Sequence, residues 1–316
     1  MKKSNSNDAS GFLLVALGAC LWGSDAFFRR ALALELPSTI VVAGEHLIIT
    51  VLLFPVLWRA ATAVRRLTAG QIVSLLIIGV GSSALATVLF TSAFRYGDPN
   101  TPLLLQKLQP LFAVTAASWI LRERLRPRFG IYFLLALGGA YLITFPDPTN
   151  VEIAQLTPAL LAVGAALLWG LGTVLGRHVA PAVSPIQLTA LRVAIGLAFL
   201  APAVVIQGQA PGIGDAVDQA GALVLLALVP GLIALVIYYN GLRSTPASAA
   251  TLAELAFPLS AVVINYLAFG ATLSTSQWFG LAALSATILV MGLVGRREKG
   301  AHELGIDSVA LAVGNP

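Results

Sequence analysis

Leu21-Trp22-Gly23, with Arg30 seven residues after the glycine, recurs in this chain as Leu168-Trp169-Gly170, with Arg177 at the same distance. The two copies are 147 residues apart. The same offset relates two pairs of prolines, and one residue more relates a third pair: Pro55 and Pro202, Pro99 and Pro246, Pro110 and Pro258. These matches indicate an internal duplication, and duplicated membrane halves are typical of secondary transporters.

The composition is that of a membrane protein. Of the 316 residues, 58% are hydrophobic and only 10% are charged, and the mean hydropathy is +0.88. Soluble domains carry about 25% charged residues. Apolar stretches of the roughly 20 residues that cross a bilayer as a helix fill most of the chain. Short segments of alternating polarity, which would indicate a membrane β-barrel, do not occur. We therefore predict an all-α polytopic membrane protein.

Ten membrane-spanning helices are predicted, five in each copy of the duplication. The predicted spans cover residues 11–28, 38–58, 71–93, 101–120, 128–145, 158–176, 185–206, 221–240, 248–269 and 277–295. The resulting organisation is an N-terminal segment (1–10), a first repeat (11–146), an external linker (147–157), a second repeat (158–295) and a tail (296–316).

The distribution of lysine and arginine predicts the orientation. With the N-terminus in the cytoplasm, fourteen basic residues fall in cytoplasmic segments, and three, Arg29, Arg30 and Arg95, fall outside. This excess favours cytoplasmic N- and C-termini. It also accounts for the net charge of +5 without a nucleic-acid partner. Because five spans per copy is an odd number, the second copy enters from the opposite face, and the halves are predicted to be inverted-topology repeats.

Five charged residues lie inside the predicted spans. Each costs about 2.5–3.5 kcal/mol at a helix centre, so they should face the protein interior and find partners. The 147-residue offset aligns Glu45 with Arg192, and Lys107 and Glu254 lie near equivalent positions. We therefore expect two ion pairs of reversed polarity, Glu45–Lys107 and Arg192–Glu254. A simple local pair is expected for Asp25, because Arg29 follows one helical turn later.

Two roles remain open for these charged groups. They are gate latches that neutralise each other, or they hold the ends of a zwitterionic substrate or a coupling proton. His46 follows Glu45 and is either a polar interior residue or a proton relay.

Aromatic, amide and proline residues suggest where a cavity lies. Trp22 and Trp169 fall near the middle of spans, so they pack between helices or line an aromatic-compatible cavity. Tyr239 belongs to a polar-aromatic group with Tyr238 near the end of its span. Gln106 and Gln109 flank Lys107. Pro110 and Pro258 fall within spans, where proline bends a helix, and are expected to be hinges.

With these residues assembled, the chain resembles the drug/metabolite transporter superfamily, and within it the EamA-type transporters. The likeness rests on the two Trp-Gly blocks, the ten-span inverted duplication, and a run of three motifs. The motifs are Ala93-Phe94-Arg95-Tyr96, Leu108-Gln109-Pro110 and Arg122-Glu123-Arg124-Leu125. Overall, the chain looks most like the YddG-type amino-acid exporters.

The resemblance implies a basket of ten helices around a central cavity. It implies export of aromatic and other apolar amino acids across the bacterial inner membrane by alternating access. The family's cavity-lining spans place six candidate substrate contacts in this chain, namely Trp22, Gln106, Gln109, Trp169, Tyr239 and Glu254. The expected partners are the lipid bilayer and a small-molecule substrate.

Another substrate class in the same fold, such as drugs, nucleosides or other metabolites, remains an alternative. An intramembrane enzyme is a remote one, because no HExxH, paired aspartate or Ser/His/Asp set occurs. The absence of a P-loop indicates no ATP hydrolysis by this chain. The single cysteine, Cys20, permits no thiolate metal site, and neither metal nor cofactor is expected. Transport direction, proton coupling and a monomeric or homodimeric state stay open.

Overall fold

The computed structural model describes residues 4–120, 129–150, 153–242, 253 and 256–303, and its regular elements are all helices. The first half contains α1 (Ser4–Gly23), α2 (Asp25–Glu35), α3 (Ser38–Leu52), α4 (Phe54–Val64), α5 (Ala69–Ile77), the π-helix η1 (Ile78–Leu85), α6 (Ala86–Ala93), α7 (Asn100–Leu105), the 3-10 turn η2 (Gln106–Leu108), α8 (Gln109–Ile120) and α9 (Phe129–Thr144). The second half contains α10 (Ile153–Val179), α11 (Pro185–Ile206), α12 (Gly212–Asp218), α13 (Ala220–Leu226), the π-helix η3 (Ala227–Ile233), α14 (Ala234–Leu242), α16 (Ala256–Phe269) and α17 (Thr275–Glu303).

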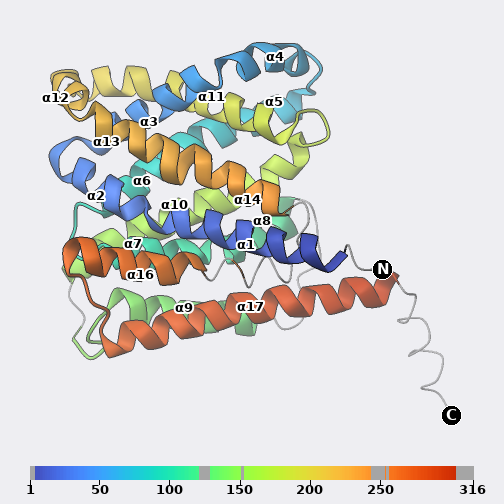
Figure 1. Cartoon of the computed structure of the whole chain (residues 1–316), viewed down its shortest axis with the longest axis vertical. Helices are drawn as coiled ribbons and strands as arrows, with labels where there is room; N and C mark the ends of the chain where they lie inside the picture. The colour runs from blue at the N-terminus through green and yellow to red at the C-terminus, as the bar shows by residue number, and fades with distance from the viewer. Residues whose placement is uncertain (1–3, 121–128, 151–152, 243–252, 254–255, 304–316) are drawn as a thin grey trace.

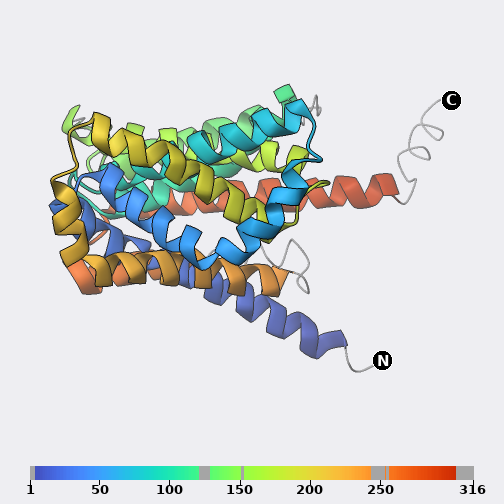
Figure 2. The ribbon, with the colours of Figure 1, turned by 90° about the horizontal axis from the view of Figure 1, so that it is seen from above.

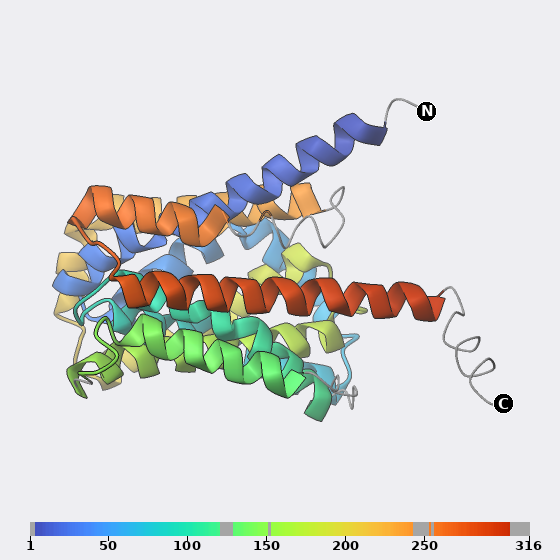
Figure 3. The same ribbon diagram turned by 90° about the horizontal axis from the view of Figure 1, so that it is seen from below.

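The long helices run side by side and form one bundle (Figure 1). Helices from both halves share the same general direction when the bundle is seen from above (Figure 2). The start of α1 and the end of α17 lie at the same end of the bundle, here called the terminal end (Figure 3). The opposite end, where α12 lies, is called the far end.

Five continuous helical segments of the described chain are long and apolar enough to cross a membrane. They are Ser10–Glu35, Ala69–Ala93, Ala154–Gly176, Pro185–Ile206 and Ala220–Tyr238. The bent pair α3 and α4 would be a sixth. Several described helices border residues outside the described ranges, so the count of ten spans and the inverted arrangement stay predictions.

Two predicted boundaries differ from those of the helices. The first span continues through α2 to Glu35 instead of ending at residue 28, because Ser24 interrupts the helix by a single turn residue. Helix α10 begins at Ile153, inside the segment 147–157 predicted as a linker.

The predicted span 38–58 is broken at Leu53. Helix α3 ends at Leu52, and α4 continues at an angle of 83° to it. Pro55 lies in the first turn of α4, where its missing N–H breaks no helical hydrogen bond. In a continuation of α3, the same missing N–H would leave a helical carbonyl without its donor. The equivalent Pro202 lies inside the continuous helix α11, so the duplicated proline breaks only one copy.

The glycine of each Trp-Gly block makes the same helix crossing. A Cβ at Gly23 of α1 would lie 2.8 Å from the Ala261 nitrogen of α16. A Cβ at Gly170 of α10 would lie 2.9 Å from the Ala113 nitrogen of α8. Each crossing joins a helix of one repeat to a helix of the other. The duplication seen in the sequence is therefore also present in the packing.

We expect Gly23→Ala and Gly170→Ala each to destabilise the protein by about 1–3 kcal/mol, because the added methyl group meets backbone atoms that cannot rotate away. Gly138→Ala in α9 is the matched control, since nothing lies within 4 Å of a Cβ there. The control should be neutral or slightly stabilising. Thermal unfolding of the purified protein in detergent measures all three, and equal midpoints for the three variants would disprove the crossings.

Candidate functional site

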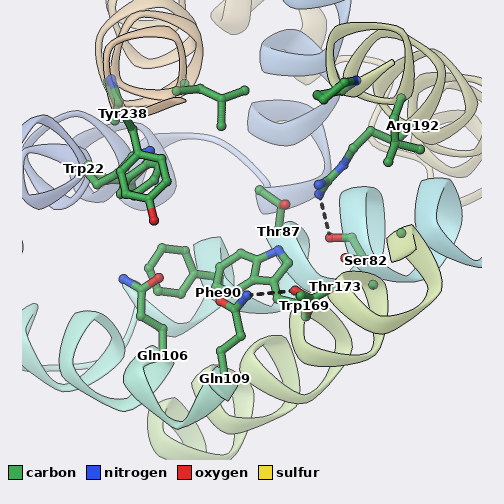
Figure 4. A pocket seen from close by; sticks show the side chains of 18 of the residues that line it. Trp22, Ser82, Thr87, Phe90, Gln106, Gln109, Trp169, Thr173, Arg192 and Tyr238 are labelled. Carbon is green, nitrogen blue, oxygen red and sulfur yellow. Dashed lines mark hydrogen bonds between the residues drawn. The ribbon is translucent and has the colours of Figure 1, made fainter. Parts of the chain in front are cut away.

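A cavity of about 900 Å³ lies between the two halves and is lined by residues from helices of both. Figure 4 shows part of its wall, with Trp22 and Tyr238 on one side and Gln106 and Gln109 on another. Within the described residues, the lining contains eight of the candidate site residues predicted from sequence: Trp22, Glu45, Gln106, Lys107, Gln109, Pro110, Trp169 and Arg192.

The cavity reaches the surface at the terminal end. Its lining includes Ala180 and Pro185, which flank the α10–α11 connection and are exposed. This connection lies at the end of the bundle where α1 begins (Figures 1 and 2). None of the lining residues belongs to the described connections at the far end.

The far end is closed by polar contacts between the halves. The Asn265 side-chain amide donates to Asn100 Oδ1 at 2.8 Å, and both residues are at most 1% exposed. The Gln277 amide donates to Asp98 Oδ2 at 3.3 Å. Arg30 lies 5.3 Å from the centre of the Phe269 ring. Among the described residues, the cavity lining therefore extends to the surface at the terminal end, whereas contacts between the halves close the far end.

A buried ionic cluster is formed by Asp25, Arg29, Glu45 and Thr91, and its three charged residues line the cavity. Arg29 Nε donates to Asp25 Oδ2 at 2.6 Å, and Arg29 Nη1 donates to Glu45 Oε2 at 3.0 Å. Arg29 Nη1 also donates to Thr91 Oγ1 at 3.0 Å. The local Asp25–Arg29 pair is confirmed. Below, these four residues are called the ionic cluster.

The ionic cluster corrects two predictions. Glu45 forms its ion pair with Arg29 and not with Lys107, so the predicted Glu45–Lys107 pair is wrong. Arg29 is only 4% exposed and belongs to α2, so its predicted place in an external loop is also wrong. Both errors have one cause: the first helical segment continues to Glu35, seven residues beyond the predicted end at residue 28, and so includes Arg29.

The two copies of the duplication differ at this position. The 147-residue offset relates Asp25 to Gly172 and Arg29 to Gly176. Charged side chains thus fill the wall in the first copy, whereas two glycines occupy the equivalent positions of α10. Both glycines line the cavity. A Cβ at Gly172 would lie 2.1 Å from Ser82 Oγ, so glycine lets the π-helix η1 approach α10 closely.

Two aromatic pairs line the cavity. Trp22 of α1 stacks on Tyr238 of α14 with ring centres 4.7 Å apart. Phe90 of α6 meets Trp169 of α10 edge to face, with ring centres 5.1 Å apart. Trp22 and Trp169 occupy equivalent positions of the duplication, so the wall presents one indole from each half. The edge-to-face geometry of Phe90 and Trp169 is one that ring quadrupoles favour.

The segment from Gln106 to Pro110 contributes amides and a cation. The helix changes to a 3-10 turn over Gln106–Leu108, just before Pro110 at the second position of α8. Lys107 Nζ lies 4.2 Å from the centre of the Phe257 ring. The Gln109 amide donates to Thr173 Oγ1 at 3.4 Å. The predicted irregularity beside Pro110 is present, and its role as a hinge stays a prediction.

The remaining predicted residues lie elsewhere. His46 is 4% exposed and does not line the cavity, because its ring nitrogens contact Val42 O at 2.9 Å and Ser83 Oγ at 3.0 Å. Pro258 is buried near the start of α16, behind the cavity-lining Phe257. Glu254 and the side chain of Tyr239 lie outside the described residues. The predicted Arg192–Glu254 pair is therefore untested, although Arg192 Nη2 does donate to Ser82 O at 3.5 Å.

Sequence reasoning missed Arg29, Thr91 and Phe90 as parts of the site. Asp25 and Arg29 could have indicated a site from sequence. Charged residues inside an apolar membrane helix are costly to insert and for that reason usually belong to functional sites. Nothing in the sequence indicated the two π-helices, η1 and η3. The 147-residue offset relates most of η1 to η3, so both copies of the duplication have a π-helix at this position. The two π-helices contribute Ser82, Pro230 and Gly231 to the cavity lining. Such helices often occur at functional sites.

Two stretches of the chain, residues 9–145 and 156–293, match the profile of the EamA-like transporter family. The chain belongs to this family. It is accordingly a transporter and a multi-pass membrane protein, and the family argues against the intramembrane enzyme. The paired match reproduces the duplication that the Trp-Gly blocks indicated. A solved structure shares the fold of this EamA-like transporter with a TM-score of 0.57 and 19% identity, covering 92% of this chain and 98% of that one.

Two relatives of this EamA-like transporter are informative. It is 31% identical to the riboflavin transporter ImpX of Fusobacterium nucleatum over 304 residues, which cover 91% of this chain and 97% of that protein. It is 29% identical to the uncharacterized transporter YwfM of Bacillus subtilis over 193 residues, which cover 61% of this chain and 64% of that protein. These relatives give no support to the expected likeness to aromatic amino-acid exporters.

Proposed function

We propose that this protein is a secondary transporter of riboflavin or a closely similar planar heteroaromatic metabolite. The observation that carries the proposal is the cavity wall, which combines two aromatic pairs with amide and charged groups. The relative named as a riboflavin transporter, which aligns with almost the whole chain, supports the same substrate. A flavin substrate corresponds to the alternative given from sequence, that of another substrate class in the same fold. It replaces export of aromatic amino acids as the leading hypothesis.

The chemistry of the wall suits a flavin. Faces of Trp22, Tyr238, Phe90 and Trp169 can stack on a fused aromatic ring system, and each such stack contributes about 1–3 kcal/mol for a nucleobase. The amides of Gln106 and Gln109 can pair with ring carbonyls and nitrogens or with the hydroxyl groups of a polyol chain. A cavity of about 900 Å³ falls within the range of small-molecule sites.

An aromatic amino acid is the second candidate. The cavity wall carries cations, Lys107 and Arg192, as well as the carboxylates Asp25 and Glu45. Groups of both signs could hold the two ends of a zwitterion next to the aromatic pairs. The same wall would therefore accept tryptophan or phenylalanine, with the ring stacked as the flavin would be.

The shape of the cavity supports alternating access. A site that is open at the terminal end and sealed at the far end is one of the two states that such a mechanism needs. With the predicted orientation, the terminal end is cytoplasmic, and this arrangement would correspond to an inward-open state. Exchange of the two similar halves around the cavity would produce the outward-open state.

Net flux into proteoliposomes tests the proposal. Purified protein should carry riboflavin, which is followed by its own fluorescence, and unlabelled flavins should compete with it. Excess tryptophan or phenylalanine should compete weakly. Rapid flux of labelled aromatic amino acids without any flux of riboflavin would overturn the flavin proposal and favour the second candidate. Absence of flux for both classes would reject both.

A further inference from the structure

The ionic cluster contains two carboxylates and one guanidinium. Arg29 contacts both oxygens of each carboxylate: Nη2 lies 2.8 Å from Asp25 Oδ1 and 3.4 Å from Glu45 Oε1, in addition to the shorter contacts of Nε and Nη1. Arg29 is 4% exposed and Glu45 is 8% exposed. Within this cluster, one negative charge is therefore balanced by direct contact and the second is not.

The other charged and titratable groups near the cluster make contacts of their own within the described residues. His46 follows Glu45 on α3, but its ring contacts Val42 O and Ser83 Oγ. Lys107 lies against the Phe257 ring. Arg192 is directed to Ser82 O. The ion pairs formed by Asp25 and Glu45 within the described residues are both with Arg29.

An unbalanced carboxylate deep in an apolar bundle is costly, and the usual remedies are a proton or a cation. We propose that the pair Asp25 and Glu45 binds one proton and that this proton couples substrate transport to the proton gradient. The inference rests on the proposed function for its substrate. Binding of the proton converts one carboxylate to a carboxyl group, while Arg29 keeps the other as its counter-ion.

The position of the cluster suits a coupling site. Asp25, Arg29 and Glu45 all line the cavity, so a proton can reach them from the open terminal end. Thr91 accepts a hydrogen bond from Arg29, which leaves its hydroxyl proton available to a neighbouring carboxylate. Enclosing the cluster with its extra negative charge costs more than enclosing it neutral. Protonation should therefore accompany closure of the cavity.

Amide replacements test the proposal in proteoliposomes. Wild-type protein should accumulate riboflavin against its concentration gradient when a pH gradient of one sense is imposed. Glu45→Gln and Asp25→Asn each mimic the protonated cluster and keep acceptors for Arg29. Both should lose this accumulation, and any riboflavin flux that remains should not respond to the pH gradient. Glu35→Gln, an exposed position on the same helix α2, is the control and should behave as the wild type.

Accumulation by Glu45→Gln and Asp25→Asn equal to that of the wild type would overturn the proposal. So would wild-type riboflavin exchange that no pH gradient drives uphill. Absence of any riboflavin exchange in the wild type would instead reject the proposed substrate. Infrared titration of the purified protein is independent of substrate. It should show one carboxyl C=O band that both amide variants lack, and its absence from the wild type would also overturn the proton site.

Discussion

Replacement of Arg29 by glutamine should destabilise the protein by about 3–5 kcal/mol, because two buried carboxylates lose their shared counter-ion. Arg29 supplies every direct ion pair that Asp25 and Glu45 make within the described residues. Glutamine keeps most of the length and one amide donor but removes the charge. Transport should be lost, and a lower pH should partly restore folding because protons can replace the missing guanidinium.

Arg59→Gln is the matched control for Arg29→Gln. Arg59 is exposed on α4, and loss of an exposed charge costs at most about 1 kcal/mol. The measurements are the thermal unfolding midpoint in detergent at two pH values and riboflavin exchange in proteoliposomes. Equal midpoints for the two variants would contradict a structural role for the ionic cluster.

Removal of either indole from the cavity wall should have the second largest effect, and it should act on substrate binding. Trp22→Ala and Trp169→Ala should each weaken riboflavin binding by about 1–3 kcal/mol, which is roughly 5- to 150-fold in Kd. Substitution by phenylalanine should recover part of the loss, because a smaller ring still offers a face for stacking.

Trp119→Ala is the control for the two indole variants. Trp119 is 86% exposed on the outside of α8 and does not line the cavity. Quenching of riboflavin fluorescence by the purified protein measures the three dissociation constants. Wild-type affinity in both Trp22→Ala and Trp169→Ala would show that the substrate does not bind between the aromatic pairs.

The sequence was most informative where the structure requires a particular residue type, such as glycine at a close helix crossing. Two Trp-Gly blocks at a fixed spacing predicted the duplication, and Gly23 and Gly170 indeed make equivalent crossings between the halves. Charged residues inside the predicted spans indicated groups that face the interior, because polar groups at membrane depth are costly elsewhere. The resemblance to EamA-type transporters, rather than the residues alone, suggested Trp22, Gln106 and Trp169 as cavity-lining residues, and all three line one cavity.

Sequence reasoning failed where a choice depends on neighbours that are distant in the chain. Glu45 could pair with Lys107 or with Arg29, and only the packing of α3 against α2 and α6 selects Arg29. Pro55 and Pro202 are equivalent in the duplication, yet only Pro55 accompanies a break. The π-helix η1 is packed against α10 and α11, which are distant in the chain, and no local sequence pattern indicated it.

Counterflow of riboflavin tests most directly whether this cavity belongs to a flavin carrier. Proteoliposomes loaded with excess unlabelled riboflavin are diluted into a trace of labelled riboflavin. A carrier with one alternating site should accumulate label transiently above the external concentration, because exit of unlabelled substrate returns empty sites to the outside. Uptake that never exceeds the external concentration, or that does not depend on preloading, would contradict the carrier mechanism proposed for this protein.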